Sequence, residues 1–132
     1  MLLCVPNGIS AEEFIVPRGT EEIGECAFLC SDIDRVVLCE GVKKICGSFT
    51  CSSISEIVLP NTLEVIESST FYQCFYLKSI ILPSSLKYIG DGAFEECDGL
   101  EKIHIPKNVT YIGDAAFPPN CKITVDKKMF MP

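Results

Sequence analysis

The sequence predicts a β-rich solenoid, in which one short supersecondary unit repeats along an axis. Two observations carry this prediction. A strand-like phrase that ends in proline recurs about every 23 residues, as Ile57-Val58-Leu59-Pro60, Ile80-Ile81-Leu82-Pro83 and Ile103-His104-Ile105-Pro106. Each copy is followed at similar offsets by Ile, Phe and Cys, and in the last two copies these read Ile-Gly and Ala-Phe. Such self-similarity indicates units that bury their apolar faces only against their neighbours.

Each copy corresponds to one rung, meaning one full circuit of the solenoid. The predicted strand-starting residues are Phe14, Val36, Ile57, Ile80, Ile103 and Ile123, with steps of 22, 21, 23, 23 and 20 residues. We therefore expect about five to six rungs of ~23 residues, with one parallel sheet along one face and short strands and turns on the other. The crossover connections are expected to be right-handed, as parallel strands require.

Within a rung, the residue pattern assigns each part of the circuit. The alternation in Ile103-His104-Ile105 points both isoleucines inward and His104 outward, and Pro106 ends the strand because it has no N–H to give. A second apolar pair, Val109 and Ile112, marks the return across the rung. The aromatic ring that follows is expected to enter the interior. The rings concerned are Phe28, Phe49, Phe71, Phe94 and Phe117.

The full pattern, Leu-x-x-Ile-x-Leu-Pro-x-x-Leu-x-x-Ile-Gly-x-x-Ala-Phe-x-x-Cys, closely resembles the BspA-type leucine-rich repeat family over residues 1–126. The resemblance implies an α/β, β-rich leucine-rich-repeat solenoid forming a single domain over 1–132. Residues 1–13 look like a short N-terminal variant rung, and 127–132 are read as a C-terminal tail. Members of the family are typically surface proteins of mucosa-associated microbes, linked to adhesion to host matrix proteins.

Composition agrees with one domain and excludes several functions. A chain of 132 residues with 48% apolar residues can fill one core. The net charge of -7 and the scattered basic residues argue against nucleic-acid binding. The sequence contains no run of about 18 apolar residues, so no membrane span is predicted. The opening residues lack the basic segment and the apolar run of a signal peptide.

Nine cysteines first suggest a disulfide framework, but their spacing predicts otherwise. Four of them share one repeat position and are expected to form an inward column of buried thiols: Cys30, Cys51, Cys74 and Cys97. Parallel side chains about 4.8 Å apart exceed the usual Cβ separation of a disulfide, roughly 3.5–4.5 Å, and a straight column cannot surround zinc. The column favours a reducing, cytoplasmic location, or the cell surface if the chain is a fragment of a longer family member.

Catalysis and cofactor binding find little support in the sequence. His104, the single histidine, has no Ser or Cys at a spacing that the rungs would bring together, and no phosphate-binding glycine loop occurs, so we expect no enzyme activity and no cofactor. Glu67, Asp91 and Asp114 are assigned to one position of consecutive rungs and are expected to stack at one edge. Calcium could bridge such a row, but solvated acids at a turn are the favoured interpretation.

The remaining feature is the outward position of the predicted strands. Read in order, it is occupied by Ile15, Val37, Val58, Ile81, His104 and Thr124, and the charged residues beside it include Arg35, Glu56 and Lys102. Four consecutive β-branched apolar residues form a stripe of the kind that marks contact surfaces. The alternative is that β-branched residues simply suit strands. We predict that these nine residues bind a partner.

Two function classes follow. The first is a non-catalytic protein-binding module, with an adhesion-related role implied by the family resemblance. The second is a small acidic intracellular regulator or inhibitor that occupies a site on its partner. In both cases the partner is a protein of unknown identity, with no nucleic acid and no membrane span, and the chain is expected to be a monomer or a weak homo-oligomer.

Overall fold

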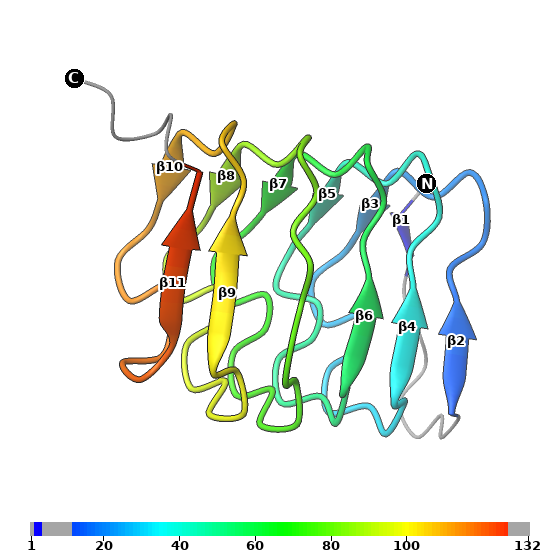
Figure 1. Cartoon of the computed structure of the whole chain (residues 1–132). Helices are drawn as coiled ribbons and strands as arrows, with labels where there is room; N and C mark the ends of the chain where they lie inside the picture. The colour runs from blue at the N-terminus through cyan, green and yellow to red at the C-terminus, as the bar shows by residue number, and fades with distance from the viewer. Residues whose placement is uncertain (1, 4–11, 127–132) are drawn as a thin grey trace.

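The computed structural model describes residues 2–3 and 12–126, and this part of the chain winds into a β-solenoid with two long faces (Figure 1). Along one face, which we call the continuous face, six short strands pair in parallel without a gap. They are β1 (Leu2–Leu3), β3 (Glu22–Ile23), β5 (Lys44–Ile45), β7 (Val65–Ile66), β8 (Tyr88–Ile89) and β10 (Tyr111–Ile112). The tail assigned to 127–132 and most of the variant rung lie outside the described residues.

The opposite face is divided, and we call it the broken face. Three parallel strands form its first part, β2 (Glu13–Ile15), β4 (Arg35–Val37) and β6 (Glu56–Val58), and two form its second, β9 (Lys102–Ile105) and β11 (Lys122–Val125). The segment 78–82 lies between them and belongs to neither sheet (Figure 1). The β-rich solenoid is confirmed, while the α/β label is too broad, since the described residues contain no helix.

The single six-stranded sheet expected from Phe14 to Ile123 is therefore interrupted at Ile80. The interruption coincides with a change in the length of the arc. By arc we mean the chain from the core phenylalanine to the next strand of the broken face. Phe28 to Val36 and Phe49 to Ile57 are steps of eight residues, and the strands on either side of these arcs pair. Two arcs are one residue longer, Phe71 to Ile80 and Phe94 to Ile103, and across these no strands pair.

The two arc lengths use different turns. In the eight-residue arcs a buried serine closes the turn, because the Ser31 hydroxyl oxygen accepts the Ile33 N–H at 3.3 Å and Ser52 does the same for Ile54 at 3.2 Å. In the nine-residue arcs a buried cysteine takes the same place. There the Leu77 N–H donates to the Cys74 carbonyl at 3.3 Å, and Leu100 repeats this with Cys97. We attribute the loss of pairing to the added residue, which shifts the following segment relative to the preceding strand.

The core is a column of stacked phenylalanine rings, as predicted. Ring centroids of Phe28, Phe49, Phe71 and Phe94 are 4.7, 5.2 and 5.0 Å apart and nearly parallel, and all four rings are buried. Phe117 continues the column at 5.5 Å but is only partly buried. The stack links every rung, so both faces rest on the same interior.

The cysteine column is confirmed in one half and wrong in the other. Cys74 and Cys97 are buried, and their thiols donate to the carbonyls of Phe49 and Phe71, both at 2.9 Å. Hydrogen bonding to Cys97 and burial raise the pKa of Cys74 far above its usual value. Cys30 and Cys51 are exposed instead. They follow their phenylalanine by two residues, at a turn position with φ of 52° and 58° that Gln73 and Glu96 occupy in later rungs.

The predicted acidic row is also wrong in one member. Backbone hydrogen bonds place Glu67 level with Gly90 and Gly113, because each of these N–H groups donates to the isoleucine carbonyl one rung earlier. Ser68, not Glu67, is therefore level with Asp91 and Asp114. The glycines are required here, since a Cβ at Gly90 would overlap the backbone of Glu67 and Ser68.

Candidate functional site

The predicted contact stripe lies on the broken face, in two parts. Ile15, Val37 and Val58 are register partners on β2, β4 and β6, so their side chains lie side by side. Ile15 is 60% exposed and Val58 38%, whereas Val37 is partly buried. Ile81 stands apart on the unpaired segment and is 86% exposed, more than any other large apolar side chain described. The stripe is apolar and solvent-facing, but its members do not form one continuous ladder.

The charged residues beside the first part of the stripe pair with one another. The Arg35 guanidinium lies between two carboxylates, donating to Glu56 Oε1 from Nε at 2.9 Å and to Glu13 from Nη1. These hydrogen bonds raise the pKa of Arg35, which therefore stays charged. Because the three side chains are exposed to solvent, they contribute little to stability. Arg35 and Glu56 thus form a closed ionic cluster rather than a free charge.

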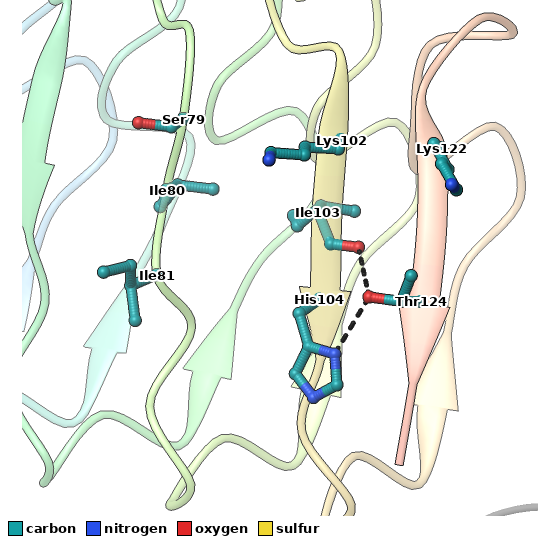
Figure 2. Close-up of a pocket in the computed structure, with 8 residues that line it drawn as sticks. All are labelled: Ser79, Ile80, Ile81, Lys102, Ile103, His104, Lys122 and Thr124. Atoms are coloured by element: carbon teal, nitrogen blue, oxygen red, sulfur yellow. Dashed lines mark hydrogen bonds between the residues drawn. The ribbon is translucent and has the colours of Figure 1, made fainter. Parts of the chain in front are cut away.

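The second part of the broken face holds the polar members of the predicted site. His104 and Thr124 are register partners on β9 and β11, and His104 Nδ1 lies 2.9 Å from Thr124 Oγ1 (Figure 2). On the other side of the ring, His104 Nε2 lies 3.0 Å from Asp126 Oδ1. The imidazole is thereby fixed in orientation. Carboxylate, imidazole and hydroxyl meet here in the order of a nucleophilic triad, but His104 and Asp126 are about half exposed, which favours a positioning role over catalysis.

Two grooves flank the unpaired segment. The larger, of about 460 Å³, extends from this segment across β9 to β11, and Figure 2 shows the side chains that line it. They are Ser79, Ile80, Ile81, Lys102, Ile103, His104, Lys122 and Thr124. The smaller, of about 260 Å³, lies on the β6 side and includes Glu56, Val58 and Asn61. Ile80 and Ile81 contribute to both grooves, so one short segment forms the wall between them.

The structure also identifies residues that the candidate list missed. Lys122 and Ser79 line the larger groove, and two aromatic side chains, Phe75 and Tyr76, are exposed on the longer arc at 48% and 61%. The repeat pattern treats these positions as spacers. The available signal was the additional residue between Phe71 and Ile80, which accompanies both the unpaired segment and the exposed aromatic pair.

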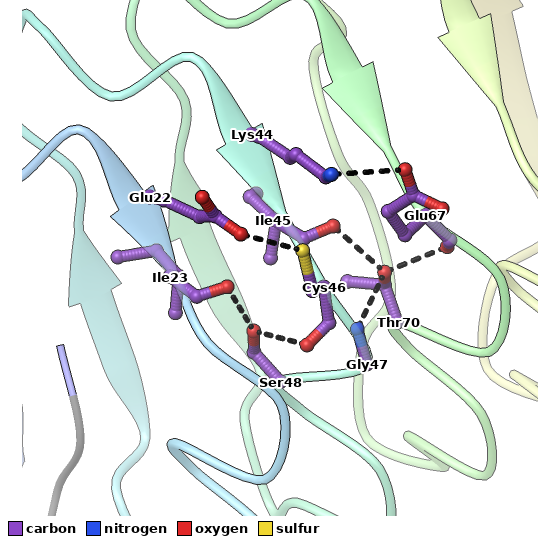
Figure 3. Close-up of polar contacts among 9 residues, drawn as sticks. All are labelled: Glu22, Ile23, Lys44, Ile45, Cys46, Gly47, Ser48, Glu67 and Thr70. Atoms are coloured by element: carbon purple, nitrogen blue, oxygen red, sulfur yellow. Dashed lines mark hydrogen bonds and ion pairs between the residues drawn. The ribbon is translucent and has the colours of Figure 1, made fainter. Parts of the chain in front are cut away.

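A polar cluster beside the continuous face is a second candidate, but its groups satisfy one another (Figure 3). The Ser48 hydroxyl lies 2.8 Å from the Gly24 carbonyl and 3.1 Å from that of Ile23. Thr70 donates to the Glu67 carbonyl at 2.7 Å and accepts the Gly47 N–H at 3.2 Å. These buried hydroxyls stand where other rungs have alanine, and they hold neighbouring rungs together.

Ionisable side chains in the same cluster are paired as well. The Lys44 ammonium lies 3.5 Å from Glu67, and the Cys46 thiol donates to Glu22 at 3.2 Å (Figure 3). Burial, together with that hydrogen bond, raises the pKa of Cys46 to about 11, so its thiol is un-ionised at neutral pH. Within residues 2–3 and 12–126 no group of three His, Cys, Asp or Glu side chains is arranged to hold a metal ion. The cluster is structural.

Comparisons with known proteins agree with this architecture. A family model described as BspA type leucine rich repeat region matches residues 6–125 in six copies. A leucine rich repeat protein of T. pallidum shares 30% identity over 83% of this chain and 55% of its own, with a TM-score of 0.76. The pneumococcal vaccine antigen PcpA shares 27% identity over 98% of this chain and 34% of its own, with a TM-score of 0.78.

A leucine-rich repeat protein from Bacteroides ovatus shares 30% identity over 96% of this chain and 33% of its own, with a TM-score of 0.73. This chain therefore spans between a third and somewhat more than half of these structures. None of the curated proteins matches it. No helix long and apolar enough to cross a membrane occurs in the part of the chain described. Repeat pattern, solenoid and family model agree, and the chain belongs to the BspA-type leucine-rich repeat family.

Proposed function

We propose that this chain is a non-catalytic protein-binding module and that the broken face is its contact surface. The observation that carries the proposal is the exposure of Ile81 at 86%, on a wall between two grooves. An apolar side chain held so far out of the core gains nothing for folding, while a partner that covers it gains the free energy of its burial. The adjoining side chains of Ile15, Val37 and Val58 extend the apolar surface across β2, β4 and β6.

The interface would combine an apolar centre with a polar rim. The apolar members are those just named, and the rim comprises the Arg35–Glu56 cluster, Lys102 and the His104–Thr124 pair. Such an arrangement resembles the usual anatomy of protein interfaces, in which most of the energy comes from a few desolvated central side chains. The nine residues predicted from the sequence are thus proposed to act as one surface.

The biological role of this binding is one of the two function classes derived above. An adhesion-related role is supported by the family, one of whose structural relatives is described as a vaccine antigen. A small acidic regulator is supported by the net charge of -7. We favour adhesion, because the chain matches longer repeat proteins over nearly its whole length. Capture on host matrix proteins beside capture from cell lysate separates the two classes.

The contact surface is tested by charge substitution. Ile81→Glu and Val58→Lys place a charge at the centre of the surface, where desolvation would cost affinity, and we expect each to weaken binding of the captured partner by more than about 2 kcal/mol. Asp98→Lys is the control, because Asp98 is exposed on an arc away from the stripe. Circular dichroism confirms that each variant is folded. Unchanged affinity for both stripe variants would exclude the broken face as the contact surface.

A further inference from the structure

A row of four side chains runs across successive arcs, each two residues after a core phenylalanine. Its members all have positive φ, between 52° and 60°, and they are Cys30, Cys51, Gln73 and Glu96. The N–H of each of the first three donates to the carbonyl of the residue just before the next member, at 2.9 to 3.1 Å. This is the register of a parallel ladder, so the four positions are level and their side chains leave the backbone in the same direction.

Side chains in this row reach from one arc to the next. The Cys51 thiol donates to Gln73 Oε1 at 3.2 Å, and Gln73 Nε2 donates to Glu96 Oε1 at 3.4 Å. Cys30 is the neighbour of Cys51 on its other side. Desolvation first, and then the charge of Cys30 and a hydrogen bond with it, raise the pKa of Cys51. The row therefore places two thiols beside each other on neighbouring arcs.

Exposure separates this pair from the inward cysteines. Cys30 and Cys51 are exposed, whereas Cys74 and Cys97 are buried and donate to backbone carbonyls at 2.9 Å. Packed side chains are held parallel and too far apart to bond, but exposed side chains are free to change rotamer. Level Cα atoms of adjacent parallel segments lie about 4.8 Å apart, inside the disulfide range of about 4.4–6.8 Å. Only the Cβ atoms need to approach, by a few tenths of an ångström.

From these observations we propose that Cys30 and Cys51 are a site of reversible oxidation, at which a disulfide joins two neighbouring arcs. The oxidant is a small disulfide of the glutathione class. The thiolate of Cys30 attacks one of its sulfurs, so that a mixed disulfide forms and one small thiol leaves. The thiolate of Cys51 then attacks the Cys30 sulfur, the internal bond forms and the second small thiol leaves. Two electrons and two protons pass from the cysteines to the oxidant.

The order of attack follows from the surroundings of the two thiols. The Cys51 thiol is held protonated by its hydrogen bond to Gln73, and its raised pKa lowers its thiolate fraction, so the first attack is assigned to Cys30. Reversibility follows from exposure of both sulfurs and from a Cβ spacing at the long end of the disulfide range, which are features of easily reduced bonds. The site lies on the arcs and does not depend on the proposed contact surface.

Oxidised glutathione added to the folded, reduced chain tests the site, with mass spectrometry of unreduced peptides as the readout. We expect an internal bond between Cys30 and Cys51, with the loss of two hydrogen atoms, and its reopening in excess reduced glutathione. Cys51→Ser should stop at a mixed disulfide on Cys30. At equal free glutathione, the parent should lose this adduct at least about tenfold faster than Cys51→Ser, because its second thiol is already in place.

A matched variant moves the pair by one arc. Cys30→Ser combined with Gln73→Cys puts the second thiol on the other side of Cys51, and the internal bond should then join Cys51 to the introduced thiol. Circular dichroism confirms that each variant is folded.

Three results would overturn the proposal. The first is a stable glutathione adduct on both Cys30 and Cys51 of the parent chain. The second is a bond from either cysteine to Cys74 or to a second chain in place of the internal bond. The third is loss of glutathione from Cys30 at equal rates in the parent and in Cys51→Ser, which would show that the two thiols do not act together. A bond that excess reduced glutathione leaves intact would refute its reversibility.

Discussion

The two faces of the solenoid are built by the same rungs, yet one sheet is continuous and the other is not. The continuous face pairs six strands of two residues each, from β1 to β10. The broken face has longer strands but loses pairing around Ile80-Ile81-Leu82, a run of three residues with strong β tendency or bulk. Strand propensity therefore does not decide which segments pair here. The geometry of the connecting arc decides, because it sets how far each strand stands from the last.

The two faces also differ in how far their polar and apolar groups are satisfied within the chain. On the continuous face and its polar cluster, backbone and side-chain groups are matched rung by rung, as with Ser48 and Thr70. On the broken face, the segment 78–82 leaves backbone groups free and Ile81 exposed. A repeat protein can leave one rung unpaired because neighbouring rungs and the shared phenylalanine stack hold it in place. The proposed contact surface is centred on this unpaired rung.

The largest expected effect comes from the element that both faces share. Phe71→Ala removes a fully buried ring from the middle of the stack and leaves a cavity, which should destabilise the chain by about 3–5 kcal/mol. Both faces should unfold together, since the loss exceeds what a small domain easily tolerates. Urea unfolding followed by circular dichroism measures it. Phe117→Ala is the matched control and should cost less, because Phe117 is only partly buried; equal losses would contradict the stacked-core account.

Much of the fold could be predicted from the sequence. The period, the inward isoleucines and the phenylalanine column followed from spacing alone, because buried positions repeat most strictly. The break at Ile80 did not follow, since the one-residue difference between the arcs was visible but its effect on pairing depends on turn geometry. A separate one-residue offset explains the cysteines: Cys30 and Cys51 stand two residues after their phenylalanine, and Cys74 stands three after Phe71. Treating them as one column merged two positions.

The second prediction alters the arc itself. Cys74→Ser combined with deletion of Phe75 converts the nine-residue arc into the eight-residue type with a serine turn. The segment 78–82 should then pair with β6, and each new backbone hydrogen bond should add about 0.5–1.5 kcal/mol of local stability. Amide hydrogen exchange measures the gain as slower exchange at residues 79–82.

The control for this change is Cys74→Ser alone, which keeps the nine-residue arc and should leave exchange at residues 79–82 fast. If the shortened arc leaves these amides as unprotected as in the parent chain, arc length is not the cause of the break. If the single substitution protects them, the residue type rather than the length controls pairing. In either case the continuous face should retain its protection, since its strands pair with one another on the opposite side of the solenoid (Figure 1).

The third prediction separates the two cysteine positions without changing the fold. A thiol reagent should label Cys30 and Cys51 in the native chain, because both are exposed, and should label Cys74 and Cys97 only after denaturation. Hydrogen bonding to Cys97 and burial raise the pKa of the Cys74 thiol, so it stays protonated as well as inaccessible. Mass spectrometry of labelled peptides reads the result. Labelling of Cys74 at the rate of Cys51 would refute its assignment to the core.

The candidate site was predictable only in part. The outward residues from Ile15 to Thr124 followed from period-two alternation, but their partners did not. Arg35 is paired by Glu13 and Glu56, and His104 contacts Thr124 and Asp126. These contacts cannot be derived from one strand, because each joins residues one rung apart. The grooves follow from the break at Ile80, so they could not be predicted from a complete sheet.

The smallest expected effect concerns pH and the continuous face. Cys46 follows β5, and its pKa is raised from 9.0 to about 11, first by burial and then by its hydrogen bond to Glu22. A thiol with a raised pKa in the folded state stabilises the fold fully below pH 9 and loses that contribution as pH rises towards 11, since the unfolded chain releases the proton first.

The variant Cys46→Ser tests this, because its serine cannot ionise in this range. Urea midpoints of parent and variant should therefore fall by different amounts between pH 8 and pH 11, with the larger fall in the parent. The difference should be small, because the thiol is partly exposed. Lys44, whose pKa is raised first by Cys46, loses that interaction in the variant and so contributes to the same difference. Parallel pH profiles would show that Cys46 ionises equally in the folded and unfolded chain, and the polar cluster would then not shield it.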